Sequence, residues 1–202
     1  FRKDSPLYQK IKLAPLFSSI EEITDRTKWL LSTAAMVEGI MHLISSNPQK
    51  DRDFLAMKRS LWSGTGTRSD LGKMESNGKR DTSVLRNLYI ENKDEEIYEI
   101  IFRYFDAVNE ILWKNASADS VITKTIGISV LFDILKAIIE NEGIQDSFEK
   151  YISLISDVDY TSDYFSLSGG GKVKLRRILK YKLGFLTDAD LIESDIRFLQ
   201  EP

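Results

Sequence analysis

The sequence predicts a mainly α-helical fold. The chain of 202 residues contains only 11 glycines and 4 prolines, which is low for an all-β sandwich. Two long segments, 95–113 and 125–140, repeat apolar residues at helical spacing, and a hydrophobic content of 42% suffices for a core of ordinary size. We expect one mainly helical domain over 1–202, built on a central antiparallel helical hairpin, with a minor β element near the N-terminus.

The first elements are short. Apolar residues alternate with lysines across Leu7–Leu13, which is the period of an edge strand with one wet face. The Ser18–Glu22 segment has the pattern of a capping box, so we expect a short helix to start there. A clearer helix follows between Thr33 and Ile44, with a Ser32 or Thr33 cap, and Asn47-Pro48 ends it.

Residues 49–92 differ in character from the segments around them. Turn-forming residues occupy 63–67 and 75–79, and short helical anchors are expected at 59–62 and 84–88. We interpret the segment as an excursion from the domain. Between residues 58 and 86 the basic residues outnumber the acidic ones: Lys58, Arg59, Arg68, Lys73, Lys79, Arg80 and Arg86 against Asp70, Glu75 and Asp81. A basic segment of this kind can attract a polyanion.

The predicted hairpin combines two buried helices. Acidic residues at 94–96 lie in the first turn of the first helix, where they interact favourably with the positive end of its dipole. The second helix is expected to end near Gly143, because glycine is common at helix ends. The connection at 115–119 is short, so the helices are expected to pack antiparallel. Gly127 would let the facing helix come close, and a further helix is expected at 146–155.

The strongest functional signal lies at 169–182. Three glycines, Gly169, Gly170 and Gly171, precede the basic residues Lys172, Lys174, Arg176, Arg177, Lys180 and Lys182, and no acid occurs between Asp163 and Asp188. The pattern predicts a flexible turn that opens onto a basic amphipathic helix with Leu175, Ile178, Leu179 and Leu183 on its inner face. Glycine amides at a helix start suit a phosphate, and the cations attract a nucleic-acid backbone. A solvated helix face remains the alternative.

Other chemistry finds little support in the sequence. The glycines are no Walker A loop, because Ser166 and Val173 stand where that motif needs Gly and Ser or Thr. Cysteine is absent, which excludes disulfides and thiolate sites and fits a reducing, cytoplasmic compartment. His42 is the only histidine, and the acids at 157–163 lack the Gly and Glu of a calcium loop. We therefore expect no catalytic residues, metal or cofactor, and an enzyme is the least supported class.

Three patches resemble a known family. They are Asp4-Ser-Pro-Leu-Tyr-Gln-Lys-Ile-Lys-Leu13, Ile101-Phe-Arg-Tyr-Phe-Asp-Ala-Val108 and Thr123-Lys-Thr-Ile-Gly-Ile-Ser-Val-Leu131. Together they look like the C-terminal helical half of the DGQHR-domain proteins, which include DndB-like proteins associated with bacterial DNA phosphorothioation. The Asp-Gly-Gln-His-Arg string itself is absent, so that site cannot be assigned to any residue. The resemblance implies a DNA-linked regulatory or defence protein, of which this chain would be a fragment.

Two function classes follow. The first is a DNA-associated regulatory protein that binds the phosphate backbone non-covalently through residues 172–182, with residues 58–86 as a second contact. The alternative is a helical protein–protein interaction or assembly module, including a homo-oligomer, without direct DNA contact. No apolar run approaches the roughly 18 to 20 residues that span a bilayer, so no membrane partner is expected.

Overall fold

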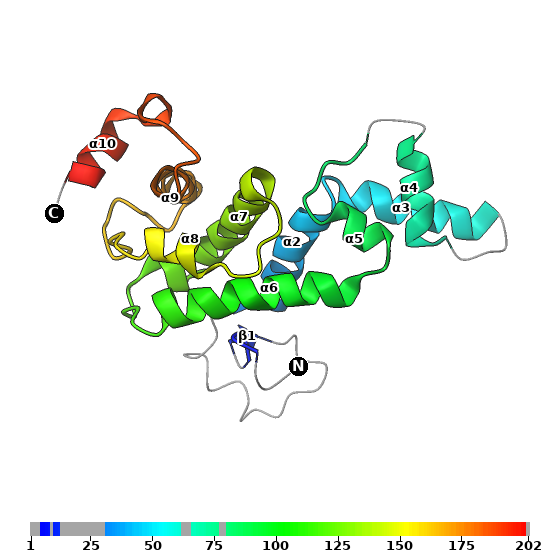
Figure 1. The fold of residues 1–202 in the computed structure, drawn as a ribbon, viewed down its shortest axis with the longest axis horizontal. Coiled ribbons are helices and arrows are strands. Elements are labelled where there is room, and N and C mark those ends of the chain that lie inside the picture. The colour runs from blue at the N-terminus through cyan, green and yellow to red at the C-terminus, as the bar shows by residue number, and fades with distance from the viewer. Residues whose placement is uncertain (1–4, 9, 13–30, 62–65, 77–79, 201–202) are drawn as a thin grey trace. The chain divides into compact units, whose positions relative to one another are not determined.

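The protein is mainly α-helical (Figure 1). The computed structural model describes residues 5–8, 10–12, 31–61, 66–76 and 80–200. The described chain divides into two compact units: unit 1 comprises 1–36 and 102–202, and unit 2 comprises 37–101. The helices are α2 (Thr33–Ile44), α3 (Pro48–Leu61), α4 (Arg68–Ser76), α5 (Arg86–Ile90), α6 (Asp94–Val108), α7 (Thr125–Glu142), α8 (Glu149–Leu154), α9 (Gly169–Lys182) and α10 (Glu193–Gln200), with a π-helical turn η1 (Asn109–Trp113) and 3-10 turns η2 (Val121–Thr123) and η3 (Asp188–Asp190).

The N-terminal segment differs from the expected edge strand. Leu7 and Tyr8 lie in a turn, in which the Tyr8 amide donates to the Ser5 carbonyl (2.9 Å). Strand β1 covers only Ile11–Lys12 and pairs in parallel with β2 (Leu31–Ser32). Among the described residues of the alternating run, Leu7 is buried in a turn and Ile11 and Lys12 form the strand; residues 9 and 13 lie outside the described ranges. The expected capping box at 18–22 lies outside the described residues.

Unit 2 contains the segment that we expected to be an excursion. The described part of 49–92 is largely helical, since α3, α4 and α5 fall within it, and Figure 1 shows these three helices together. The start of α3 has a local cause: Asn47 Oδ1 accepts the Lys50 amide (2.9 Å), and Pro48 takes the first helical position, where no amide hydrogen is needed. The 44–48 break thus ends α2 and begins α3.

A buried charge cluster connects the helices of unit 2. The Arg86 guanidinium, 2% exposed, donates to Asp51 of α3 (2.5 and 3.0 Å) and to Glu75 of α4 (2.5 and 2.8 Å). Ser45 Oγ donates to the same Asp51 carboxylate (2.7 Å). Burial alone would lower the pKa of Arg86, but the hydrogen bonds and charges of its two carboxylate partners outweigh burial and raise that pKa above its ordinary value. Arg86 was expected on a basic surface and is instead enclosed.

Aromatic packing forms the centre of unit 1. Phe105 lies edge-on to Phe132 of α7 (5.1 Å between centroids) and stacks on Trp113 of η1 (5.7 Å). The Tyr104 hydroxyl donates to the Leu131 carbonyl (2.8 Å), and burial raises its pKa well above the usual range. These rings are fully or almost fully buried, so the apolar stripe that the sequence placed on α6 and α7 is core.

Helix α7 has a more extensive neighbour than α6. Its long side-by-side contact is with α9, while the contacts with α6 centre on Tyr104 and Phe105. Gly127 allows a close approach, as expected, but the approaching backbone is η2: an added Cβ would lie 2.2 Å from the Val121 carbonyl oxygen. Gly143 ends the helix with φ 77°, a conformation that favours glycine.

Candidate functional site

The three glycines form the first turn of α9. They were expected in a flexible turn before the helix, but α9 begins at Gly169 with Ser168 as its cap. Ser168 Oγ accepts the Gly171 amide (3.3 Å), and its carbonyl accepts the Lys172 amide (3.0 Å). Gly171, one of the expected phosphate ligands, therefore donates within the protein. Its lack of a side chain serves packing, because a Cβ would lie 1.8 Å from the Ser166 carbonyl oxygen.

The inner face of α9 is the one that the sequence predicted. Leu175, Ile178 and Leu179 are fully buried, and Leu183 is nearly so. This face lies along α7. Each buried leucine or isoleucine stabilises the folded state by on the order of 1.5 to 3 kcal/mol. The apolar face thus determines which cations point away from the core.

Three cations follow one another along one edge of α9. Lys172, Arg176 and Lys180 are spaced by four residues, so they lie one turn apart on the same side of the helix; we call them the basic row. Lys172 Nζ lies 3.7 Å from the Asp133 carboxylate of α7, and Arg176 lies 3.6 Å from the same oxygen. Lys172 also donates to Ser129 Oγ (2.6 Å).

The basic row carries a positive surplus. One carboxylate, Asp133, faces two cations, and no partner of the Lys180 side chain lies within the described ranges. The side chains of Lys172 and Arg176 are 36% and 43% exposed. Two partly exposed cations share one carboxylate, and the half-buried Lys180 adds a third positive charge one turn further along this edge.

The other three predicted cations have separate partners. Lys174 Nζ lies over the Tyr164 ring (4.2 Å to the centroid). Lys182 Nζ pairs with Asp157 (2.6 Å). Arg177 donates from Nε (2.5 Å) and from a terminal nitrogen (3.0 Å) to the Asp195 carboxylate of α10. The structure therefore divides the six predicted residues into the basic row and three cations that each have a partner of their own, namely a tyrosine ring for Lys174 and a carboxylate for Arg177 and Lys182.

Asp195 lies at the centre of a polar cluster. Besides Arg177, it accepts the Tyr164 hydroxyl (2.5 Å) and the Ile192 amide (2.9 Å), and its side chain is fully buried. Burial would raise the pKa of Asp195, but these hydrogen bonds together outweigh burial and lower it. The sequence did not reveal this residue, because an acid in the first turn of a helix is ordinary helix-start electrostatics.

The cations of the 58–86 segment are also largely occupied. Arg68 pairs with Asp94 (2.5 Å) and stacks on Tyr89 (4.3 Å). Lys73 pairs with Asp70 (3.6 Å), and Arg80 donates to Asn87 (3.0 Å). The side chains of Lys58, Arg59 and Lys79 lie outside the described part of the chain. With Arg86 buried, the segment offers fewer accessible cations than its composition indicates.

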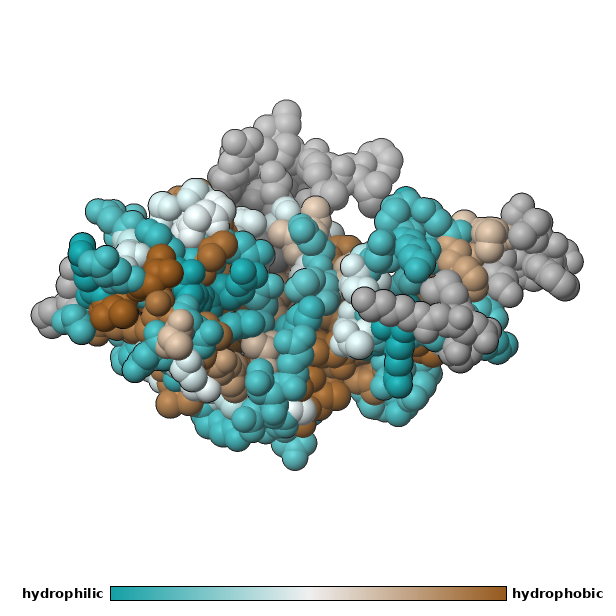
Figure 2. Space-filling view, turned by 90° about the horizontal axis from the view of Figure 1, so that it is seen from above, coloured by the Kyte–Doolittle hydropathy of each residue, from teal (hydrophilic) through white to brown (hydrophobic). Residues whose placement is uncertain are grey.

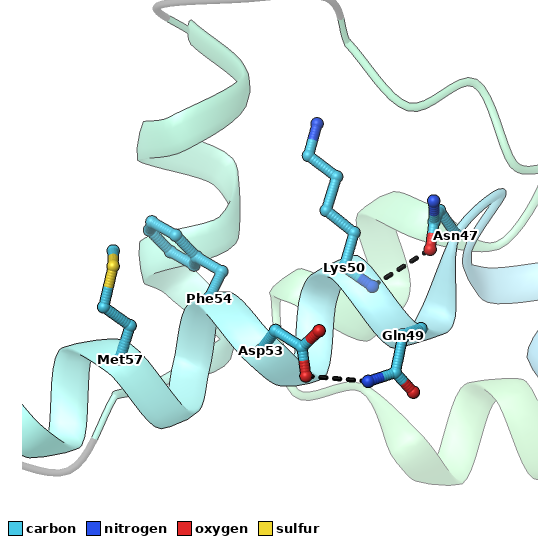
Figure 3. A pocket seen from close by; sticks show the side chains of 6 residues that line it. All are labelled: Asn47, Gln49, Lys50, Asp53, Phe54 and Met57. Carbon is cyan, nitrogen blue, oxygen red and sulfur yellow. Dashed lines mark hydrogen bonds between the residues drawn. The ribbon is translucent and has the colours of Figure 1, made fainter.

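A shallow groove of about 500 Å³ lies along the start of α3 in unit 2. In Figure 3, Lys50, Phe54 and Met57 project from one side of the helix, while Gln49 donates to Asp53 (2.8 Å). All the lining residues, Asn47, Gln49, Lys50, Asp53, Phe54 and Met57, come from eleven consecutive positions. The groove is a partly apolar ledge on one helix, and its residues provide no nucleophile paired with a base.

Comparisons with protein-family models, with curated proteins and with solved structures gave no match. Within the described ranges, no cluster of three histidine, cysteine or acidic side chains is arranged to hold a metal ion. None of the helices that the structure describes combines the length and apolar character needed to cross a bilayer.

Proposed function

We propose that the protein is a DNA-associated regulatory protein of a bacterial DNA-modification or defence system, which binds the phosphate backbone through the basic row of α9. The resemblance to the C-terminal half of DGQHR-domain proteins supports the biological setting. The observation that carries the proposal is the surplus of positive charge where Lys172 and Arg176 share Asp133. Phosphates attract such exposed cations without reading sequence.

The proposal assigns different roles to five of the six predicted cations. Lys172, Arg176 and Lys180 would contact phosphates, because their charge is not balanced one for one. Arg177 and Lys182 each face their own carboxylate, so their net contribution to an approaching polyanion is small. Sequence-specific contacts form no part of the proposal.

A salt titration of binding to duplex DNA tests this function. Each lost phosphate contact lowers the slope of log K against log salt by roughly 0.9, so the double variant Arg176→Gln with Lys180→Gln is expected to lower it by roughly 1.8. These residues are preferred to Lys172 because Lys172 then remains beside Asp133. The matched control is Lys114→Gln with Lys150→Gln, which makes the same charge change at exposed positions.

The control is expected to leave the slope unchanged within error. Affinity that does not depend on salt, or a slope that falls equally in the two double variants, would contradict backbone binding by the basic row. Circular dichroism of each variant establishes that the helical content is retained.

The second candidate function is a helical protein–protein interaction module. The α3 ledge favours it, since Met57 is 50% exposed beside Phe54. Met57→Glu would then weaken self-association or partner binding in analytical ultracentrifugation, with Arg52→Glu on an exposed position of the same helix as its control. If the protein sediments as a monomer and retains DNA at low salt, this candidate is excluded in favour of the first.

A further inference from the structure

Helix α10 is attached to unit 1 in an unusual way. Its only buried residue is a carboxylate, that of Asp195, whereas Ile192 just before the helix and Ile196 within it are exposed. Figure 2 shows hydrophobic residues among hydrophilic ones at the left, where α9 and α10 lie. Helices are ordinarily held by a buried apolar face, whereas α10 relies to an unusual extent on the polar contacts of Asp195.

Aromatic contacts complete the attachment. Phe198 of α10 stacks on Tyr164 (4.9 Å between centroids, 13° between planes) and meets Phe165 edge-on (4.8 Å). Tyr164 also receives Lys174 over its ring and donates to Asp195. Tyr164 and Asp195 therefore connect α10 to unit 1 and also contact two cations of α9, Lys174 and Arg177.

We propose that α10 is a releasable latch in which the Asp195 carboxylate occupies Arg177 in place of a DNA phosphate, so that α10 docking and DNA binding compete. The inference rests on the proposed function. A guanidinium can donate two parallel N–H groups to a carboxylate or to a phosphate in the same bidentate arrangement. Release of α10 would expose Arg177 next to Arg176 and one turn from Lys180, which widens the basic row.

Two features would allow the latch to open. A helix of eight residues has little stability of its own in water, and Arg177 is already 20% exposed. Water and salt screen the side of the pair that Arg177 exposes, whereas the Asp195 side chain is fully buried, so the pair opens only when α10 moves and the carboxylate reaches water. A polyanion that brings many phosphates to this edge can therefore displace one carboxylate.

Asp195→Asn tests the latch, with Glu193→Gln as the matched control in the same helix. The control removes one charge from an 80% exposed side chain. In amide hydrogen exchange without DNA, α10 is expected to lose protection in Asp195→Asn and to keep it in Glu193→Gln. With a 20-base-pair duplex, Asp195→Asn is expected to bind roughly three- to tenfold tighter than the unmodified chain, with a salt slope steeper by roughly 0.9.

Two further measurements connect the gain to Arg177. Adding Arg177→Gln to Asp195→Asn removes the gain in affinity if the two residues are coupled. Tyr164→Phe keeps the stack on Phe198 and the charge of Asp195 but removes one hydrogen bond to that carboxylate. It is expected to raise the affinity for DNA as Asp195→Asn does, by a smaller factor. In the unmodified chain, DNA is expected to lower the protection of the α10 amides.

The outcomes separate the latch from the proposed function. DNA binding by the unmodified chain that leaves α10 protected, or an Asp195→Asn affinity equal to that of Glu193→Gln, overturns the latch and leaves the proposed function standing. Absence of salt-dependent binding in every variant overturns the proposed function and the competition together. The exchange data on Asp195→Asn still decide in that case whether Asp195 holds α10.

Discussion

Unit 1 and unit 2 each hold an arginine by carboxylates, with different degrees of enclosure. Arg86 of unit 2 is 2% exposed and donates to Asp51 and Glu75 from two helices. Arg177 of unit 1 is 20% exposed and pairs with one carboxylate, that of Asp195. Both contacts join an arginine to carboxylate, but the exposed partner differs. In unit 1 the arginine reaches solvent while Asp195 is fully buried, whereas in unit 2 the arginine is enclosed and the Asp51 side chain is 11% exposed.

The difference shows how burial separates a structural charge from an exchangeable one. Removing one partner of an enclosed pair leaves a charge that neither water nor ions can reach. At a surface, an incoming anion can replace the original partner as the pair opens. The comparison therefore predicts that substitutions at Arg86 act on folding, and that substitutions at Arg177 and Asp195 act first on α10 and on ligand binding.

The largest expected effect is that of Arg86→Ala. The substitution leaves Asp51 and Glu75 buried without their counter-charge, and we expect the free energy of unfolding of unit 2 to fall by about 3 to 5 kcal/mol. Amide hydrogen exchange of α3, α4 and α5 against denaturant measures it. Arg80→Ala, at an exposed position, is the control and should change the stability by less than about 0.5 kcal/mol. Equal effects of the two variants would break the comparison.

An intermediate effect is expected from Gly171→Ala. The new Cβ would overlap the Ser166 carbonyl oxygen at 1.8 Å, so the start of α9 must shift, at a cost of about 1 to 3 kcal/mol. Gly169→Ala is the control in the same turn, because nothing lies within 4 Å of its Cβ and alanine favours a helix. Denaturant unfolding followed by circular dichroism compares them. A neutral Gly171→Ala would show that the packing of α9, unlike that of Arg86, tolerates change.

The smallest expected effect is the contribution of Asp81 to the stability of unit 2 at low pH. Burial alone would raise the pKa of Asp81 in unit 2, but hydrogen bonds from Ser46 and Ser83 outweigh it and lower the pKa to about 2. A lowered carboxyl pKa stabilises the folded state above the unfolded value, near 3.9, and the contribution is lost as the pH falls from about 4 to about 2. Because Asp81 is partly solvated, we expect on the order of 1 kcal/mol or less.

Unfolding measured between pH 2 and 6 checks this window. Asp81→Asn is expected to flatten the acid dependence of unit 2. Asp195, whose pKa is also lowered, should govern the acid release of α10 in unit 1 in the same direction. An unchanged pH profile in Asp81→Asn would mean that other carboxylates of unit 2 dominate there.

Local features of the fold were predictable. The helix at 33–44 and its Ser32 cap are confirmed, since Ser32 Oγ accepts the Ala35 amide (3.1 Å). The start of α7 and the inner face of α9 are also as predicted. Periodicity and capping depend on residues within a few positions of one another, and the sequence displays such relations directly.

Pairings over long sequence distances were not predictable. Arg86 lies 35 residues from Asp51 and 11 from Glu75, and nothing local distinguishes it from the surface cations nearby. The same holds for Asp133, which lies 43 residues before Arg176 in the chain. Conversely, the alternation at 7–13 predicted a longer strand than the described residues form, because a short alternating run also suits a turn with one buried residue.

The sequence alone thus determined the helical class, the bounds of α2, the start of α7 and the position of the basic segment, because each depends on local spacing and composition. Only the tertiary structure decided which of those cations share a carboxylate, which are individually paired and which is enclosed. The physical reason is that the free energy of a charge depends on its partners and its access to water, and both are fixed by residues that the fold brings together from distant parts of the chain.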